Sequence, residues 1–187
     1  MKKTSYQAQC LEGLSGSLGR PSVVTIGTFD GLHAGHQAVL GAAMGIAASR
    51  SLRSIAITFD PRPETVLSPN TALPDVIPVF ERIRRIHSFK FDEVVVLRFT
   101  RKLASLPGEA FLAKIEALYS MQVLCVGEDF ALGRGASCNI ATMRALGVDV
   151  VSVPLVAGSV AGQKASSTNM RRAVAEGVEA SIASRFA

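Results

Sequence analysis

Five short apolar runs, rich in valine and isoleucine, are spaced along the chain between glycine, proline or charged residues. This pattern is typical of strands that are buried in a sheet. It predicts β-strands at residues 23–26, 54–59, 93–97, 123–126 and 148–153. The first run is entirely β-branched and lies between Pro21 and Gly27, so it is expected to form a buried strand that stops at the glycine.

Apolar residues three or four positions apart separate these runs and predict helices. One helix begins near Gly35 or His36, one contains Phe80, Ile83 and Ile86, one begins near Pro107, and a short one covers residues 140–146 with Gly147 as its C-cap. Strands that alternate with helices indicate a parallel sheet covered on both faces. The sequence therefore predicts an α/β fold, a Rossmann-like doubly wound parallel sheet of about five strands with helices on both faces, in one domain over residues 1–187.

The predicted sheet also predicts where a ligand binds. In such sheets the ligand crevice lies beyond the carboxyl ends of the strands, and Gly27, Phe59 and Gly127 each stand at such an end. The remaining segments are less regular. Residues 1–20 are weakly patterned, residues 68–78 are expected to form a loop, and residues 154–165 a hairpin or an irregular excursion, before a helix that begins at residues 166–168.

The charge balance limits the classes of partner. The chain of 187 residues is 48% hydrophobic and 19% charged, below the roughly 25% charged residues of an average protein, which argues against a disordered chain. The net charge of +5 suits anionic ligands, but the basic residues are scattered. The one tight cluster, Arg82, Arg84 and Arg85, is interpreted as a solvated helical face, because a nucleic-acid patch needs a continuous stripe with stacking aromatics. No nucleic-acid partner is expected.

The cysteines and the apolar segments favour a cytoplasmic protein. Cys10, Cys125 and Cys138 are odd in number and form no C-x-x-C pair, so free thiols in a reducing compartment are the simplest interpretation. No signal peptide is recognisable, and the longest apolar run, residues 38–48, is shorter than the about 20 residues of a membrane helix. The G-x-x-x-G spacing in this run is expected to mark close packing on a neighbouring element.

The stretch G-T-F-D-G-L-H-A-G-H at residues 27–36 is predicted to bind an anion. Its glycines allow a tight turn and a close approach to a ligand. His33 and His36 lie three residues apart at a helix start, where unpaired N–H groups and the positive end of the helix dipole attract negative charge. Two other interpretations are histidines that cap or pack the helix, and a zinc pair, for which His87 is the only further histidine in the chain.

The same stretch resembles the G-x-F-D-G-x-H-x-G-H signature of the nucleotidyltransferase superfamily. Three further motifs follow in the order found in the FMN adenylyltransferase domain of bacterial FAD synthetases. They are F-D-P-R-P at residues 59–63, V-G-E-D-F at residues 126–130 and S-S-T-N-M-R at residues 166–171. The resemblance runs from about Pro21 to the C-terminus, and four motifs in order make it specific.

This resemblance implies that AMP is transferred from ATP to FMN, which gives FAD and pyrophosphate. It implies that His33 and His36 are catalytic and hold the phosphates. The ATP-binding residues that it implies are Gly27, Thr28, Phe29, Asp30, Gly31, Gly35, Ser167, Thr168 and Arg171. Mg²⁺ is expected to arrive with the phosphates of ATP, without a dedicated protein cage, and the small molecules ATP and FMN are the expected partners.

For the flavin, the resemblance implies contacts from Phe59, Pro61, Arg62, Gly127, Asp129 and Phe130. Arg62 is expected near the phosphate or pyrophosphate, and Asp129 is expected to accept a hydrogen bond from a flavin or ribityl donor. The residues themselves leave other interpretations open. Asp60 is equally suited to cap a turn, and Phe130 to fill the core.

The sequence departs from the family pattern at three places. Thr28 stands where FAD synthetases usually have asparagine, Arg62 replaces a frequent histidine, and residues 133–139 lack a further basic residue and a Gly-Asp pair. These departures concern substrate choice more than phosphate chemistry. The family commonly carries a riboflavin kinase domain after these motifs. No such domain is expected within these 187 residues, so they are not expected to make FMN. The alternatives are nucleotidyl transfer to a pantetheine phosphate or nicotinamide mononucleotide, and a non-catalytic flavin- or nucleotide-binding protein.

Overall fold

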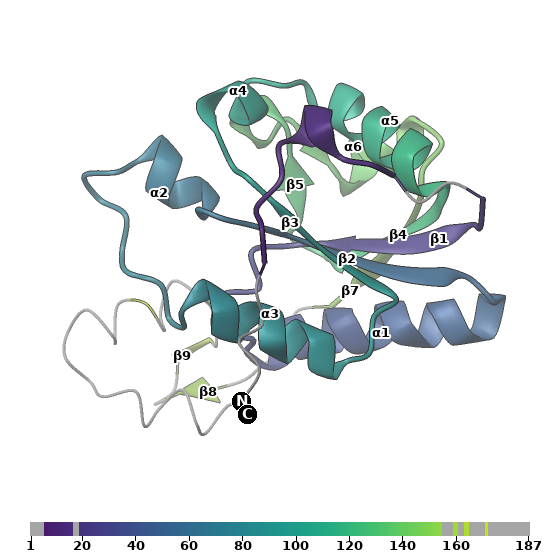
Figure 1. Cartoon of the computed structure of the whole chain (residues 1–187), viewed down its shortest axis with the longest axis horizontal. Coiled ribbons are helices and arrows are strands. Elements are labelled where there is room, and N and C mark those ends of the chain that lie inside the picture. Colours follow the sequence, from purple (N-terminus) through teal and green to yellow (C-terminus); the bar gives the residue numbers. More distant parts are fainter. Residues whose placement is uncertain (1–5, 17–18, 155–158, 161–162, 165–170, 172–187) are drawn as a thin grey trace.

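A five-stranded parallel sheet forms the centre of the molecule (Figure 1). The computed structural model describes residues 6–16, 19–154, 159–160, 163–164 and 171. The strands are β1 (Ser22–Ile26), β2 (Arg53–Phe59), β3 (Glu93–Leu97), β4 (Met121–Gly127) and β7 (Asp149–Val153), in the spatial order β3-β2-β1-β4-β7. The predicted sheet is therefore confirmed, with each strand within two residues of its expected bounds. β1 is central and buried along its whole length, as its β-branched run predicts.

Helices cover both faces of this sheet, which confirms the predicted α/β fold. Figure 1 shows α1 (Ala34–Arg50) and α3 (Val79–Ser88) on one face, and α4 (Arg101–Ala104), α5 (Gly108–Tyr119) and α6 (Ile140–Ala145) on the other. Each face has its own hydrophobic cluster: Leu40 and Ile86 belong to the first, Phe111 and Ile115 to the second. No helix in the described part of the chain is both long and apolar enough to cross a membrane.

Several short elements carry no clear pattern in the sequence. They are η1 (Leu11–Gly13), α2 (Pro63–Leu67), η2 (Arg134–Ala136), and the paired strands β5 (Ala131–Leu132) and β6 (Cys138–Asn139). Near the N-terminus, the amide of Gln9 donates to the carbonyl of Val96 and its carbonyl accepts from the amide of Arg98, at 2.9 and 2.8 Å. This segment therefore extends the β3 edge of the sheet by one bridge.

The end of the chain is described only in part. β8 (Ser159–Val160) and β9 (Gln163–Lys164) pair antiparallel, which confirms the hairpin among the two forms expected for this segment. The predicted helix start at residues 166–168 lies outside the described residues. Arg171 is described and is helical.

Two interpretations of the sequence were wrong, and both concern the face that a helix turns to the core. Gly41 and Gly45 are exposed, and no atom lies within 4 Å of where a Cβ would stand, because α1 packs through Leu40, Ala43 and other residues instead. Arg82 does not belong to the solvated face of α3, because it is completely buried. Its neighbours Arg84 and Arg85 do pair near the surface, both with Glu81.

Candidate active site

The loop between β1 and α1, residues 27–33, has an unusual backbone conformation; we call it the histidine loop, since it ends at His33 and leads to His36 in the first turn of α1. Phe29 and Leu32 have positive φ angles of 49° and 42°, and Gly31, between them, has a φ of 80°. Residues other than glycine rarely adopt this left-handed backbone conformation. Those that do cluster at functional sites, because the surrounding fold must compensate for the strain. The conformation turns the chain sharply from the buried end of β1 into the first turn of α1, at the carboxyl edge of the sheet.

The two histidines of this loop are stacked on each other. Their ring centroids are 3.7 Å apart, with 22° between the planes. His33 is the N-cap of α1, and its Nδ1 accepts a hydrogen bond from the amide of His36 at 3.4 Å. Since Nδ1 is the acceptor, the neutral His33 ring carries its proton on Nε2, which is left to donate outwards. Gly35 lies under this ring, where an added Cβ would stand 3.1 Å from His33 Cε1.

Both histidines are held in the neutral form. Burial lowers the pKa of His36 well below its ordinary value, and the neighbouring His33 adds to the effect. Phe29 packs on His36 in a T-shaped arrangement, with the two ring centroids 5.5 Å apart. Burial also lowers the pKa of His33, which the carboxylate of Asp129 opposes. At neutral pH the pair therefore meets an anion with N–H donors rather than with imidazolium charges.

This lowered pKa has a consequence for stability. Below about pH 6.5 the histidines protonate in the unfolded chain before they do so in the folded protein, so their contribution to stability is full above that pH and is lost as the pH falls. We expect the free energy of unfolding, measured in urea, to drop by on the order of 1 kcal/mol between pH 7 and pH 5.5. A smaller drop is expected in His36→Ala. A stability that stays level or rises over this interval would contradict the neutral pair.

Asp30 joins the loop to distant parts of the chain. It is completely buried. Its Oδ1 accepts from the amides of Val76 and Ile77, at 3.0 and 3.4 Å, and its Oδ2 accepts from Nε of Arg171 at 3.0 Å. Burial raises the pKa of this carboxyl, and the guanidiniums of Arg62 and Arg171 oppose the rise. Because these partners are all donors, they favour the ionised carboxylate.

Arg62 lies in the same buried cluster. Its Nε contacts Asp75 Oδ1 at 2.5 Å and stands 3.7 Å from Asp30 Oδ2, and its side chain is 1% exposed. Glu64 reaches both guanidiniums of the cluster, since its carboxylate oxygens are 3.6 Å from Nη1 of Arg62 and 3.6 Å from Nη1 of Arg171. Two buried arginines and three carboxylates therefore lie directly behind the histidine loop.

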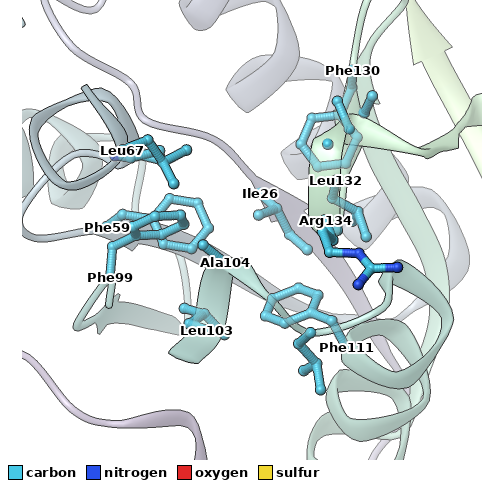
Figure 2. Close-up of a pocket in the computed structure, with 16 residues that line it drawn as sticks. Ile26, Phe59, Leu67, Phe99, Leu103, Ala104, Phe111, Phe130, Leu132 and Arg134 are labelled. Atoms are coloured by element: carbon cyan, nitrogen blue, oxygen red, sulfur yellow. The ribbon is translucent and has the colours of Figure 1, made fainter. Parts of the chain in front are cut away.

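An aromatic cavity of about 510 Å³ reaches the end of β1, where Ile26, the residue before this loop begins at Gly27, forms part of its wall. Figure 2 shows Phe59, Phe99 and Leu67 facing Phe130, Leu132 and Arg134 across it, with Ile26 from the end of β1 between them. The lining is almost entirely apolar, and the rings of Phe59 and Phe99 meet edge to face with centroids 5.6 Å apart. Such a cavity suits a flat, aromatic, largely apolar group.

The predicted flavin residues are divided between these regions. Phe59 and Phe130 line the cavity, whereas Arg62 lies in the buried cluster and Pro61 is exposed. Gly127 ends β4, and Asp129, two residues further on, is exposed near His33. Sequence analysis missed the other wall residues, among them Phe99, Leu103, Phe111 and Leu132.

The predicted ATP residues that the structure describes belong to the histidine loop and the first turn of α1, or contact this loop through Asp30. Gly27 and Thr28 follow β1 directly, and the carbonyl of Thr28 accepts from the hydroxyl of Thr58 at 3.1 Å. Arg171 is brought against Asp30, although 141 residues separate the two. Ser167 and Thr168 lie outside the described residues. Among the described residues, no group of three or more His, Cys, Asp and Glu side chains is arranged to hold a metal ion.

A strained loop with paired histidines at a helix N-terminus, beside an aromatic cavity at the same edge of a parallel sheet, defines a nucleotide-binding α/β protein. The comparisons with known proteins agree with this class. The family model of FAD synthetase matches residues 17–169, so the chain belongs to the FAD synthetase family.

Individual relatives support this assignment. The bifunctional riboflavin kinase/FMN adenylyltransferase of Buchnera aphidicola is 34% identical over 162 residues, which cover 83% of this chain and 50% of that protein. A putative bifunctional riboflavin kinase/FMN adenylyltransferase of Geobacillus thermodenitrificans is 33% identical over 157 residues, covering 83% of this chain and 84% of that protein. The chain thus spans about half the length of the first of these relatives. The crystal structure of a macrolide-efflux protein from Streptococcus pneumoniae has a TM-score of 0.74 and 28% identity, and the match covers 88% of this chain and 54% of that one.

Proposed function

We propose that this chain transfers AMP from ATP to FMN and releases pyrophosphate, so that it forms FAD. The observation that carries the proposal is the neutral, stacked pair His33 and His36 at the N-terminus of α1, next to the aromatic cavity. Membership of the FAD synthetase family and the relatives named above support the same activity.

The reaction needs no covalent intermediate with the protein. A phosphate oxygen of FMN attacks the α-phosphorus of ATP, a new P–O bond forms, and the bond to the β-phosphate oxygen breaks as pyrophosphate leaves. Catalysis of such a transfer rests on alignment and on stabilisation of the developing charge. Nε2–H of His33, the N–H groups of the first turn of α1 and the dipole of that helix supply this stabilisation. Mg²⁺ enters with ATP, whose phosphates bind it.

The aromatic cavity is the proposed site of the isoalloxazine ring. Its volume of about 510 Å³ lies within the usual range of small-molecule sites, and its apolar walls match a flat heteroaromatic group. Phe59 connects the cavity to the F-D-P-R-P motif at the end of β2. In this arrangement the ribityl phosphate extends from the cavity towards the histidine loop, where the α-phosphate of ATP is held.

Removal of one aromatic wall tests the flavin site. Phe99→Ala is expected to raise the KM for FMN about tenfold and to leave the KM for ATP unchanged. The isoalloxazine ring loses an aromatic contact, and Phe59 loses its edge-to-face neighbour. Phe80→Ala is the matched control, since Phe80 is 57% exposed and lies outside the cavity. An equal rise for both substrates, or the same effect in both variants, would contradict this placement of the flavin.

The acceptor is tested by a panel of phosphorylated compounds. Purified protein, ATP and Mg²⁺ are incubated with FMN, 4′-phosphopantetheine or nicotinamide mononucleotide, and pyrophosphate release is measured. Release with FMN alone is the expected result, because neither of the other acceptors carries a ring system that fills the aromatic cavity. Pyrophosphate release with another acceptor and none with FMN would contradict FMN as the acceptor, but would still indicate a nucleotidyltransferase.

The same proposal includes a cytoplasmic location and no nucleic-acid partner. Cys10, Cys125 and Cys138 are free thiols, which fits a reducing compartment. Arg84 and Arg85 pair with Glu81, so the basic cluster on α3 presents partly neutralised charge.

A further inference from the structure

Arg82 is completely buried behind the candidate active site, although it lies on α3, a surface helix. Its guanidinium bridges two segments of backbone: Nη1 donates to the carbonyl of Thr28 and Nη2 to the carbonyl of Phe59, both at 2.9 Å. Thr28 opens the histidine loop, and Phe59 lines the aromatic cavity. One planar side chain therefore contacts the walls of both proposed substrate sites.

These two hydrogen bonds lie just beyond the point where the backbone pairing between β1 and β2 ends. β1 and β2 pair in parallel up to Ile26 and Ile57, and the amide of Gly27 makes a last backbone bond to the carbonyl of Ile57 at 3.1 Å. Beyond that point side chains hold the two segments together. Thr58 donates its hydroxyl to the carbonyl of Thr28, and Arg82 donates to both segments at once.

The surroundings of Arg82 are polar, but no carboxylate of the described residues forms a salt bridge with it. The nearby charges are Asp30, Asp60, Asp75 and Arg62, and Asp60 accepts a hydrogen bond from the hydroxyl of Tyr6 at 2.8 Å. Nε of Arg82 is buried and has no hydrogen-bond partner among the described residues. The two carbonyl contacts are therefore the specific interactions that a shorter or neutral side chain would lose.

We propose that Arg82 is a positioning residue, which fixes the separation between the loop that holds the phosphates of ATP and the cavity that holds the flavin. The proposal rests on the proposed function. Reacting atoms in a productive complex stand about 3–3.5 Å apart, and a misplacement of about 1 Å lowers the rate on the order of a hundredfold. The substitution of Arg82 is therefore expected to lower kcat much more than it changes either KM.

The test compares Arg82→Gln and Arg82→Lys with the wild type, and uses Arg84→Gln as the matched control. Arg84 lies on the same helix, has a side chain that is 67% exposed and pairs with Glu81. Steady-state FAD formation gives kcat and both KM values, and titration with FMN, followed by flavin fluorescence, counts the folded sites. Counting the sites separates positioning from stability, because a purely structural role changes the number of sites and leaves kcat per site unaltered.

The expected result is graded. Arg82→Gln lowers kcat per site on the order of a hundredfold and keeps both KM values within about threefold of the wild type. Arg82→Lys lowers kcat per site about tenfold, because the charge remains. Arg84→Gln matches the wild type. A kcat per site within threefold of the wild type in Arg82→Gln overturns the role of Arg82, as does a loss explained by raised KM values.

Two further outcomes are decisive. If Arg82→Gln does not fold, Arg82→Lys is compared alone: a tenfold lower kcat per site with unchanged KM values supports the role, and a wild-type kcat overturns it. If the folded wild type itself forms no FAD, the proposed function is contradicted. An active wild type with an unaffected Arg82→Gln contradicts only the role of Arg82.

Discussion

His36→Ala is expected to lower kcat for FAD formation about a hundredfold or more. His36 lies in the first turn of α1, stacked on His33 and packed against Phe29. Its substitution removes a hydrogen-bond donor and also removes the ring on which His33 stacks. The loss of one hydrogen-bond donor to a transition state costs about 2.7–4 kcal/mol, which corresponds to at least this decrease. The rate is measured at saturating ATP and FMN, so that binding does not enter.

The third histidine supplies a control for this substitution. His87 lies on α3, is exposed and does not line the aromatic cavity, so His87→Ala is expected to keep the wild-type rate. Titration with ATP is expected to show that His36→Ala still folds and binds nucleotide. An unchanged kcat in a folded His36→Ala protein would remove the catalytic role of the histidine pair.

Asp30→Ala is expected to lower the free energy of unfolding by about 3–5 kcal/mol. The substitution leaves Arg62 and Arg171 buried with less compensating charge and leaves the amides of Val76 and Ile77 without their acceptor. Removal of one partner from a buried ion pair is costly because the remaining charge cannot regain its hydration. Unfolding in urea, followed by circular dichroism, measures the difference.

Asp149→Ala is the matched control for Asp30→Ala. Asp149 pairs with Arg50 at 2.8 Å, but both side chains are about half exposed, so this pair is expected to contribute only about 0–1 kcal/mol. A loss of stability in Asp30→Ala as small as that in Asp149→Ala would show that the buried cluster does not hold the histidine loop to the rest of the molecule.

The sheet and the histidine loop were predictable because their signals are local. Apolar runs rich in valine and isoleucine marked all five strands, and the glycine turn followed by two histidines at a helix start marked the anion site. The motif order also brought Arg171 into the predicted site, although its contact with Asp30 joins residues 141 positions apart. That contact depends on tertiary packing, and no local pattern specifies it.

The aromatic cavity and the role of Arg62 could not be predicted in the same way. Phe99, Phe111 and Leu132 have the same apolar character whether they line a cavity or fill a core, so the pattern gives no distinction. Arg62 follows the end of β2 within the F-D-P-R-P motif, yet the carboxylates of Asp75 and Asp30 hold it in a buried cluster.

Arg82 differs from these residues because a local signal did exist. It stands four residues before Ile86 and next to Ile83, both buried on α3, so the helical period places it on the buried face. The interpretation followed the charge of the segment instead, because three arginines within the four residues 82–85 usually indicate a solvated helical face. A charged residue at a buried helical position is better interpreted as a candidate for a specific internal contact.

The most direct test is the conversion of FMN to FAD by the purified chain with ATP and Mg²⁺, followed by chromatography, with riboflavin as a parallel substrate. FAD formed from FMN with one pyrophosphate per FAD, and no product from riboflavin, is the expected result. A folded protein that binds both ATP and FMN but forms no FAD would contradict the adenylyl transfer and direct attention to the departures at Thr28 and residues 133–139.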